Sequence, residues 1–396
     1  MSISLAKNID YIGLNDYETA LFEELWPLPQ GIAYNSYLIR DQKTAVVDSV
    51  KKNYIPEYIH TIKRLLGDGG KLDYLIINHM EPDHSGAVQA LRQVFPDLTI
   101  VGNEKTAAYL QAYFGMNRNI KIVQDQEEIS LGQHNLKFFL TPMLHWPETM
   151  MTYEKTTQTL FSGDAFGAFG ALPGGIFDDE VDLKYFESET RRYFSNIIGK
   201  YCAMVEKAIT RLENLDIQTI AATHGPVYRR NPRYIVDLYA RWSRQETEPG
   251  AVIVYASMYG HTKQMAEALA RGLTDGKIDK IEMFNIAHTH LSTLINEIWQ
   301  YKALILGSCT YNSRLFPPME MLLNFLENYK IKNHYLGIFG SYTWSGGALA
   351  ALKKFAEAGP WECVEPAPEA QGAADQEIFA QCALLGKNCA QKLAQK

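Results

Sequence analysis

Short apolar segments typical of buried strands recur through the first part of the chain, with segments of helical periodicity between them. The runs 31–40 and 44–48 flank the turn-prone residues 41–43 and predict a β-hairpin. The apolar run 74–77 predicts a buried strand over 73–78 that ends at His79. The other elements expected in this part are strands at 98–102, 136–141, 149–153, 159–161 and 219–222 and helices at 53–66, 85–95, 104–114 and 183–214.

After residue 250 the pattern changes to a regular alternation of strands and helices. The polar stretch 245–250 ends in Pro-Gly and is typical of a domain junction, so we expect one domain at 1–247 and another at 248–396. Regular alternation predicts a doubly wound parallel sheet, which binds ligands at the carboxyl ends of its strands. The expected strands are 251–256, 280–284, 302–307, 335–340 and 361–364, and the expected helices are 262–273, 291–298, 319–329, 345–358 and one from residue 375.

Composition narrows the class of protein. A length of 396 residues predicts two or three domains, and 46% hydrophobic with 21% charged residues is typical of soluble globular proteins. Together with the strands and helices described above, this predicts an α/β protein. The net charge of −7 argues against a nucleic-acid partner, because a negative surface repels phosphate. No apolar run approaches the roughly 18 residues of a membrane helix, so we expect a cytoplasmic protein without a membrane segment. Five scattered cysteines without a Cys-x-x-Cys pair argue against disulfides and against an iron–sulfur or rubredoxin-type site.

Four potential metal ligands are packed into six residues directly after the predicted strand 73–78: His79, Glu81, Asp83 and His84. Imidazole and carboxylate groups suit divalent iron, manganese and zinc, and a strand that leads into a loop lets such side chains converge. The alternative is a helix N-cap, in which Asp83 or Ser85 caps the segment 86–91. Two histidines beside two acids exceed what a cap requires, which favours half of a two-metal site.

Three later residues occupy the same kind of position, at or near the end of an apolar strand. His145 follows 140–144, Asp164 follows 159–163, and His224 follows 220–223. A single histidine is more often a packed core or surface residue than a ligand. Strand ends along one edge of a layered sheet can share a site, however, and together with the first cluster these residues predict a binuclear metal centre.

The order of these ligands resembles the metallo-β-lactamase fold and, within it, the flavodiiron proteins, also called A-type flavoproteins. Metallo-hydrolases of this fold usually carry histidine where this chain has Glu81. A carboxylate makes the site richer in oxygen, which favours iron or manganese over zinc. The resemblance implies an N-terminal αββα sandwich with two irons, one held by His79, Glu81 and His145, the other by Asp83, His84 and His224, with Asp164 bridging them.

Neighbouring residues also fit this resemblance. Trp146 and Pro147 follow one ligand, and Gly225 and Pro226 follow another. Loop packing and a role in shaping the pocket are equally good interpretations of all four. The segment around Tyr193 is a candidate source of a pocket hydroxyl.

Three loops at the predicted ligand edge of the second domain combine small hydrogen-bonding residues with aromatic ones. The first lies between a strand and a helix, where backbone N–H groups can cradle a phosphate. The set resembles flavodoxin, which implies that the first loop binds the FMN phosphate and the other two flank the flavin ring. Two positions depart from that pattern. Cys309 stands where proline or a small residue is common, and Thr343 stands where glycine is common. The residues concerned are Ser257, Met258, Tyr259, Gly260, His261 and Thr262; Ser308, Cys309, Thr310, Tyr311 and Asn312; and Ser341, Tyr342, Thr343, Trp344, Gly346 and Gly347.

The resemblance covers nearly the whole chain and implies an oxidoreductase that reduces dioxygen to water, nitric oxide to nitrous oxide, or both. Electrons would pass through FMN from a separate donor such as a rubredoxin, a flavoprotein reductase or a reduced deazaflavin. A head-to-tail homodimer, or a dimer of such dimers, would set the FMN of one subunit beside the irons of the other. The alternatives are a binuclear zinc hydrolase with a flavodoxin-like accessory module, and an electron carrier with a vestigial metal half.

Overall fold

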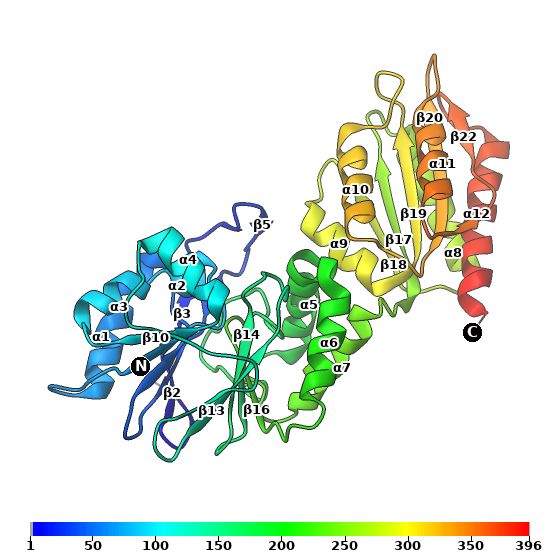
Figure 1. Ribbon diagram of the computed structural model, residues 1–396. Coiled ribbons are helices and arrows are strands. Elements are labelled where there is room, and N and C mark those ends of the chain that lie inside the picture. The colour runs from blue at the N-terminus through cyan, green and yellow to red at the C-terminus, as the bar shows by residue number, and fades with distance from the viewer. Residues whose placement is uncertain (1–2, 396) are drawn as a thin grey trace. The chain divides into compact units, whose positions relative to one another are not determined.

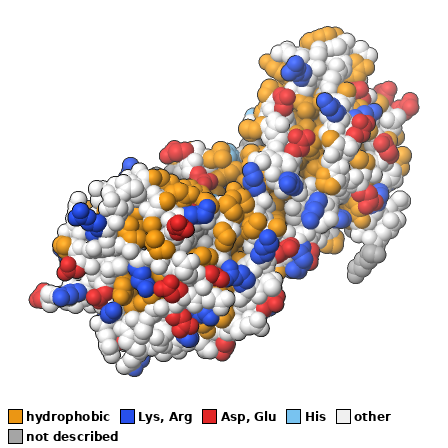
Figure 2. Space-filling view, viewed as in Figure 1, with side chains coloured by type: hydrophobic (Ala, Val, Ile, Leu, Met, Phe, Trp, Pro, Cys, Tyr) orange, Lys and Arg blue, Asp and Glu red, His pale blue; other side chains and the backbone are white. Residues whose placement is uncertain are grey.

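The structure is a computed structural model, and it describes residues 3–395. The chain forms two compact units, Met1–Ser243 and Arg244–Lys396. No helix among the described residues has both the length and the apolar composition needed to cross a membrane. Charged side chains of both signs are interspersed on the face of each unit seen in Figure 2.

Two β-sheets form the centre of the N-terminal unit (Figure 1). The first has the order β1 (Ile3–Ala6), β2 (Ile9–Tyr11), β7 (Tyr37–Ile39), β8 (Ala45–Val47), β9 (Tyr74–Ile76), β10 (Thr99–Gly102) and β11 (Ile120–Ile122). The second has the order β12 (Glu128–Ser130), β13 (Asn135–Leu140), β14 (Met150–Glu154), β15 (Thr159–Gly163) and β16 (Thr219–Ala222). Two small ribbons pair β3 (Leu14–Asp16) with β6 (Ile32–Tyr34) and β4 (Leu21–Phe22) with β5 (Trp26–Pro27).

The two sheets face each other across an apolar core. Ile39 and Ile76 of the first sheet belong to one buried cluster with Phe138 of the second, and the rings of Tyr37 and Phe161 meet across it at 5.1 Å. Helices cover the outer faces, which gives the expected αββα sandwich (Figure 1). They are η1 (Lys52–Tyr54), α1 (Ile55–Leu66), α2 (Pro82–Ser85), α3 (Val88–Val94) and α4 (Glu104–Phe114) on one side, and α5 (Leu183–Tyr193), η2 (Phe194–Ile198), η3 (Gly199–Tyr201), α6 (Cys202–Leu212) and α7 (Pro232–Ser243) on the other.

Tertiary contacts break two of the expected elements. The run 31–40 divides into β6 and β7 because the Asn35 side chain donates hydrogen bonds to the carbonyl oxygens of Ala222 and Gly225. The helix expected over 85–95 becomes α2 and α3, which are separated at Gly86. A Cβ at Gly86 would lie 2.7 Å from the backbone nitrogen of Lys52, so this close approach of two backbones requires glycine.

A parallel sheet forms the centre of the C-terminal unit. Its strand order is β18 (Ile281–Asn285), β17 (Glu248–Ala256), β19 (Tyr301–Cys309), β20 (Tyr335–Tyr342) and β21 (Glu362–Val364). β22 (Glu369–Gln371) also pairs with the end of β20. The first strand in the chain lies between the second and the third, which confirms the doubly wound, flavodoxin-like order. Residues 251–256 are all buried, as expected for a parallel strand that is covered on both faces.

Helices pack against both faces of this sheet. Ile253 and Ile305 share a buried cluster with Leu269 and Leu385, so α8 (His261–Asp275) and α12 (Gln376–Ala394) cover one face. Figure 1 shows α10 and α11 in front of the strands, on the other face. The helices on that face are α9 (Leu291–Gln300), α10 (Pro317–Asn328) and α11 (Ala348–Ala358).

Candidate metal centre and cofactor loops

All seven expected metal ligands lie at strand ends on one edge of the N-terminal sandwich, and all are buried. Four come from the segment that leads from β9 into α2, in the first sheet. His145 lies between β13 and β14, and Asp164 and His224 follow β15 and β16, in the second sheet. The ligand atoms form two groups, one of His79, Glu81, His145 and Asp164 and the other of Asp83, His84 and His224.

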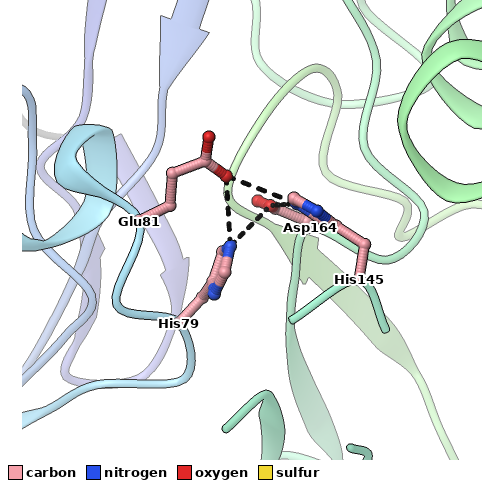
Figure 3. Close-up of side chains that lie close together, drawn as sticks. All are labelled: His79, Glu81, His145 and Asp164. Carbon is pink, nitrogen blue, oxygen red and sulfur yellow. Dashed lines mark hydrogen bonds and ion pairs between the residues drawn. The ribbon is translucent and has the colours of Figure 1, made fainter. Parts of the chain in front are cut away.

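Four side chains converge in the first group (Figure 3). The Nε2 atom of His79 is 3.1 Å from Glu81 Oε2, and the Nε2 atom of His145 is 3.3 Å from the same oxygen. Asp164 Oδ2 lies 3.0 Å from His145 Nε2 and 3.5 Å from His79 Nε2. Two imidazole nitrogens and two carboxylate oxygens therefore point at one small volume.

The second group has the same character. His84 Nε2 and His224 Nε2 lie 3.4 Å and 3.3 Å from Asp83 Oδ2. The other oxygen of Asp164, Oδ1, is 2.9 Å from His84 Nε2 and 3.6 Å from His224 Nε2. One Asp164 oxygen thus faces each group, which is the arrangement that a bridging carboxylate requires.

The helix-cap interpretation of the first cluster does not describe these side chains. The N-cap position of α2 is Glu81, with no side-chain capping hydrogen bond, and Asp83 lies inside the helix. The Ser85 hydroxyl donates to the carbonyl of Met80 instead. The acids are left to face the histidines.

Several groups orient the histidines, and sequence reasoning missed them. Glu148 Oε1 lies 2.7 Å from His79 Nδ1 and also accepts a hydrogen bond from the backbone N–H of Met80. The carbonyl oxygen of Ala33 is 2.8 Å from His224 Nδ1, and the Thr223 hydroxyl donates to Asp164 Oδ1. These contacts fix the rings so that Nε2 faces the centre, a common second layer around metal-binding histidines.

Electrostatics mark the site as a place for positive charge. Burial alone would lower the pKa of His79, but its hydrogen bonds with Glu148 and Glu81 raise the value to about 10. Burial likewise opposes protonation of His84, yet the charges of Asp83 and Asp164 raise its pKa to about 9. In each case the negative charge of the surrounding carboxylates favours the protonated imidazole by more than burial disfavours it. The same negative charge would favour a metal cation at this position.

Several ligand atoms are buried without a hydrogen-bond partner, which supports binding of metal ions. Both carboxylate oxygens of Asp83 and the Nε2 atom of His224 are buried without a hydrogen-bond partner. A buried polar atom without a partner is costly, by about 1–3 kcal/mol. Coordination to a cation would satisfy these atoms, so the donor set fits two metal ions that Asp164 shares.

The ring of His224 lies among aromatic side chains. Phe22 and Tyr193 each approach it at 5.5 Å between ring centroids, and Tyr34 does so at 5.8 Å. Tyr193 is fully buried, and its hydroxyl has no hydrogen-bond partner. The structure thus places the ring of Tyr193 next to that of a ligand and leaves its hydroxyl buried and unpartnered.

A mostly apolar cavity of about 670 Å³ opens beside Glu81 and Asp83. Its wall includes Phe22, Tyr113 and Glu23. Burial and the neighbouring charge of Glu81 raise the pKa of Glu23 to about 7. The cavity is far larger than a diatomic gas requires, so it has room for a bulky, flat group.

The other residues noted beside the ligands have structural contacts. Trp146 packs its ring edge-on against His79, at 5.2 Å. Gly225 has a φ of +69°, and a Cβ there would lie 2.6 Å from the Cβ of Ala168. That position requires glycine to bring His224 back toward the sheet.

In the C-terminal unit the three expected loops meet at the carboxyl ends of β17, β19 and β20. Ala256 is in register with Ser308, and Cys309 with Ser341. A cavity of about 30 Å³ lies between the loops. Its lining comprises Ser257, Met258, Tyr259, His261, Thr262, Cys309, Thr310, Ser341, Tyr342, Thr343 and Gly372. Gly372 was not expected there, and the loop after the short strand β22 gave no sequence signal.

The first loop has the features of a phosphate cradle. Gly260, with a φ of +96°, precedes α8, and its N–H donates to the Ser257 hydroxyl. The hydroxyls of Thr262 and Ser341 lie 2.8 Å apart, which joins the first loop to the third. Hydroxyl groups and free N–H groups at a helix N-terminus suit an anion.

Two aromatic side chains at these loops are open to solvent. Tyr259 is 86% exposed and Trp344 is 81% exposed. Because both rings belong to loops at the same cavity, they are available to stack on a flat ligand there. Ser308 was expected to bind the cofactor, but it is not among the residues that line the cavity. Its hydroxyl accepts a hydrogen bond from the Phe316 N–H instead. Burial raises the pKa of the Cys309 thiol, which keeps it neutral.

Comparisons with known proteins agree with this geometry. Residues 32–225 match the family described as ODP family beta lactamase, and residues 253–383 match the flavodoxin family. The chain is 34% identical over 99% of both chains to a nitric oxide reductase from Moorella thermoacetica. A rubredoxin oxygen:oxidoreductase from Desulfovibrio gigas superimposes with a TM-score of 0.94 at 27% identity, covering 99% of this chain and 98% of that one. A flavodiiron protein from Giardia intestinalis gives 0.94 at 25% identity, covering 99% and 97%.

Proposed function

The chain belongs to the flavodiiron protein family, and on that premise we propose that it reduces dioxygen to water, nitric oxide to nitrous oxide, or both. Electrons come from an external donor and are relayed through FMN. The observation that carries the proposal is the buried Asp164 carboxylate, which turns one oxygen to each ligand group.

The two groups divide the metals as the family pattern implies. His79, Glu81 and His145 would hold one iron, Asp83, His84 and His224 would hold the other, and Asp164 would be shared between them. Carboxylate oxygens from three acids make this donor set harder than an all-histidine site, which favours iron over zinc. When bound, two irons and FMN store up to four electrons, which is the number that reduction of one dioxygen to two waters requires.

The protein itself supports the chemistry in three ways. Glu81, Asp83 and Asp164 provide negative charge that stabilises two cations in a buried site. Glu148 and the Ala33 carbonyl hold His79 and His224 in position. The rings of Phe22 and Tyr193 exclude water beside His224, and the unpartnered Tyr193 hydroxyl offers a hydrogen-bond donor to a bound gas.

FMN belongs at the three loops of the C-terminal unit. Ser257, Thr262 and the N-terminus of α8 would hold its phosphate. The second and third loops flank the flavin ring, and the exposed Tyr259 and Trp344 are available to stack on it.

The metal centre and the FMN meet between two copies of the chain. We expect a head-to-tail homodimer, or a dimer of such dimers, that brings the flavin edge of one subunit to the cavity beside Glu81 in the other. The volume and apolar wall of that cavity support this arrangement. A strictly monomeric protein with full activity in solution would contradict it. The donor that reduces FMN is a rubredoxin, a flavoprotein reductase or a reduced deazaflavin, and we place the whole system in the cytoplasm.

The two alternative functions fit less well. A zinc hydrolase with a flavodoxin-like accessory module would be expected to carry histidine where Glu81 stands. The relatives that match over 99% of the chain include one named as a nitric oxide reductase and one named as a rubredoxin oxygen:oxidoreductase. An electron carrier with a vestigial metal half would not need seven converging ligands.

One experiment tests the proposal. Purified protein with measured iron and FMN content is reduced without oxygen and then receives separate pulses of dioxygen and nitric oxide. We expect reoxidation of the flavin together with consumption of one or both gases. Two zinc ions per chain, ester hydrolysis and no gas consumption would support the hydrolase instead.

A further inference from the structure

Residues 17–27 form a hairpin arm at the edge of the N-terminal unit, seen in Figure 1 as the dark blue hairpin labelled β5. β4 and β5 pair within it, with Phe22 opposite Trp26. Both of these rings are buried, and that of Phe22 packs at 5.5 Å from His224 and at 5.6 Å from Phe169. One face of the arm is therefore anchored to the core beside a metal ligand.

The opposite face of the arm is apolar but uncovered. Tyr17 is 59% exposed, Leu21 is 37% exposed and Leu25 is 49% exposed. The solvent face of an antiparallel pair of strands is ordinarily polar. Three large apolar side chains within residues 17–25, rimmed by the exposed acids Glu18 and Glu24, are typical of a surface that another molecule covers.

Internal hydrogen bonds hold the arm in one shape. The Leu25 N–H donates to the Phe22 carbonyl at 2.9 Å, and the Trp26 indole N–H donates to the Glu23 carboxylate at 3.1 Å. At the base of the arm, the Asp16 carboxylate accepts hydrogen bonds from two backbone N–H groups. A surface whose shape is already fixed loses little conformational freedom when it binds a partner.

A second uncovered apolar surface lies at the flavin loops. Twelve large hydrophobic side chains are exposed among the described residues, and eight of them belong to two places. Four lie on the arm or at the cavity beside Glu81 that the arm helps to line, and four lie on the three flavin loops. The first four are Tyr17, Leu21, Leu25 and Tyr113, and the second four are Met258, Tyr259, Tyr311 and Trp344. Each cofactor site therefore has an uncovered apolar surface beside it.

Charge favours contact between these two surfaces. Glu18 and Glu24 make the arm negative, whereas Arg314, exposed beside Tyr311 in the second flavin loop, carries the opposite charge. Opposite charges at the rim of an interface guide the right surfaces together, and like charges disfavour the wrong pairing. Two arms would repel each other, so the complementary contact is between an arm and a set of flavin loops.

We propose that the arm docks on the flavin loops of a second copy of this chain and holds the FMN of that copy at the cavity beside Glu81. The inference rests on the proposed function and adds to it the segment that joins the two copies. Because the arm and the cavity belong to one subunit, each arm serves the metal centre of its own subunit and the FMN of the other. An altered arm should therefore matter only on the subunit whose metal centre is in use.

The test uses a mixed dimer with one working site of each kind. Asp164→Ala supplies the subunit that binds FMN but lacks the iron pair, and Ser257→Ala with Thr262→Val supplies the subunit that keeps iron but lacks FMN. The two are coexpressed with different affinity tags, purified through both tags, reduced chemically without a donor protein and given a pulse of the gas that the wild type consumes. We expect the mixed dimer to consume this gas faster than either variant alone.

Tyr17→Ser with Leu25→Ser alters the arm without touching the cavity, because neither side chain lines it. On the subunit that keeps iron, this change should lower gas consumption by the mixed dimer about tenfold, since loss of two apolar contacts costs at least that factor in affinity. On the subunit that lacks iron, it should have no effect. Arg314→Glu should do the reverse, with a smaller loss, and only on the subunit that binds FMN.

Ile122→Ser with Leu384→Ser is the matched control, because these side chains are 44% and 48% exposed but belong to neither surface. It should leave gas consumption unchanged on either subunit. Sedimentation gives a readout apart from activity: the homodimer with the altered arm should dissociate at a protein concentration at least about tenfold above that of the wild type. Iron and FMN content verify that each variant is folded.

An altered arm that has the same effect on both subunits, or no effect on either, would overturn the docking role. So would a loss that occurs only when a donor protein reduces the FMN, because the arm would then bind the donor. The proposed function fails separately, if the wild type consumes neither gas. If the wild type is active but the mixed dimer with intact arms is not, the head-to-tail arrangement is wrong, and the role of the arm with it.

Discussion

The two cofactor regions of this chain are built in different ways. The metal ligands are all buried, and side chains such as Glu148 and Thr223 hold them in place. The flavin loops enclose a cavity of only about 30 Å³, and two of their aromatic rings, those of Tyr259 and Trp344, stand in solvent. The metal centre is therefore enclosed by the core of its unit, whereas the flavin loops leave a shallow site and two aromatic rings for a ligand to cover. Each site should respond to mutation accordingly.

The largest effect is expected from Asp164→Ala. This change removes the one carboxylate that faces both ligand groups, so iron content should fall below two per chain and gas consumption should fall to the level of metal-free protein. FMN absorbance should stay at the wild-type level, because the flavin loops lie in the other unit. Metal analysis and an oxygen electrode measure both, and full activity in this variant would disprove the bridging role.

Loss of FMN without loss of iron is expected from Ser257→Ala combined with Thr262→Val. Each hydrogen bond to a charged phosphate contributes about 1.5–3 kcal/mol, so the double variant should bind FMN much more weakly. Fluorescence titration of the flavin measures the affinity. Ser313→Ala is the control, because its hydroxyl contacts Ser345 on the exposed part of the loops. Equal weakening in the control would mean that the first loop does not bind the phosphate.

A moderate effect is expected from Glu148→Gln, which keeps the shape of the side chain but removes the charge that holds His79. Loss of such an outer contact costs about 10–100-fold in metal affinity or activity. Glu154→Gln is the control, because that buried acid accepts hydrogen bonds from the N–H groups of Thr156 and Thr157 instead. Iron retention against a chelator should fall only for Glu148→Gln.

The smallest effect is expected from Cys309→Ser. The thiol is buried and neutral, so replacing it with a hydroxyl of similar size removes no charged contact to the cofactor. Iron content should not change, and FMN affinity should change less than in the Ser257 and Thr262 variant. A larger loss of FMN in Cys309→Ser would mean that the second loop governs binding.

Sequence reasoning found the metal ligands because each stands where a strand ends, a position that depends on local pattern alone. It missed Glu148, whose place is decided by the fold: it precedes β14, yet its carboxylate reaches back to His79, 69 residues earlier. The only available signal was an acidic residue three positions after His145.

The same limit applies to the elements that were missed or broken. β1 and β2 are too short to show periodicity, and the Arg40 side chain contacts Asp10 of β2 across 30 residues of sequence. The glycine at position 86 is required by the approach of the Lys52 backbone, which no pattern near residue 86 reveals. Local order was predictable, and contacts between distant segments were not.

The origin of the ligands has a consequence for folding. Four of them follow a strand of the first sheet, and three follow or lie between strands of the second, so two bound ions would fasten the two halves of the sandwich together. A ligand present at ~100 times its Kd raises the free energy of unfolding by about 2.7 kcal/mol, and two ions act at one edge of the core. The metal centre then stabilises the fold as well as hosting the reaction. Iron starvation would lower the stability of the N-terminal unit before that of the flavin-binding unit.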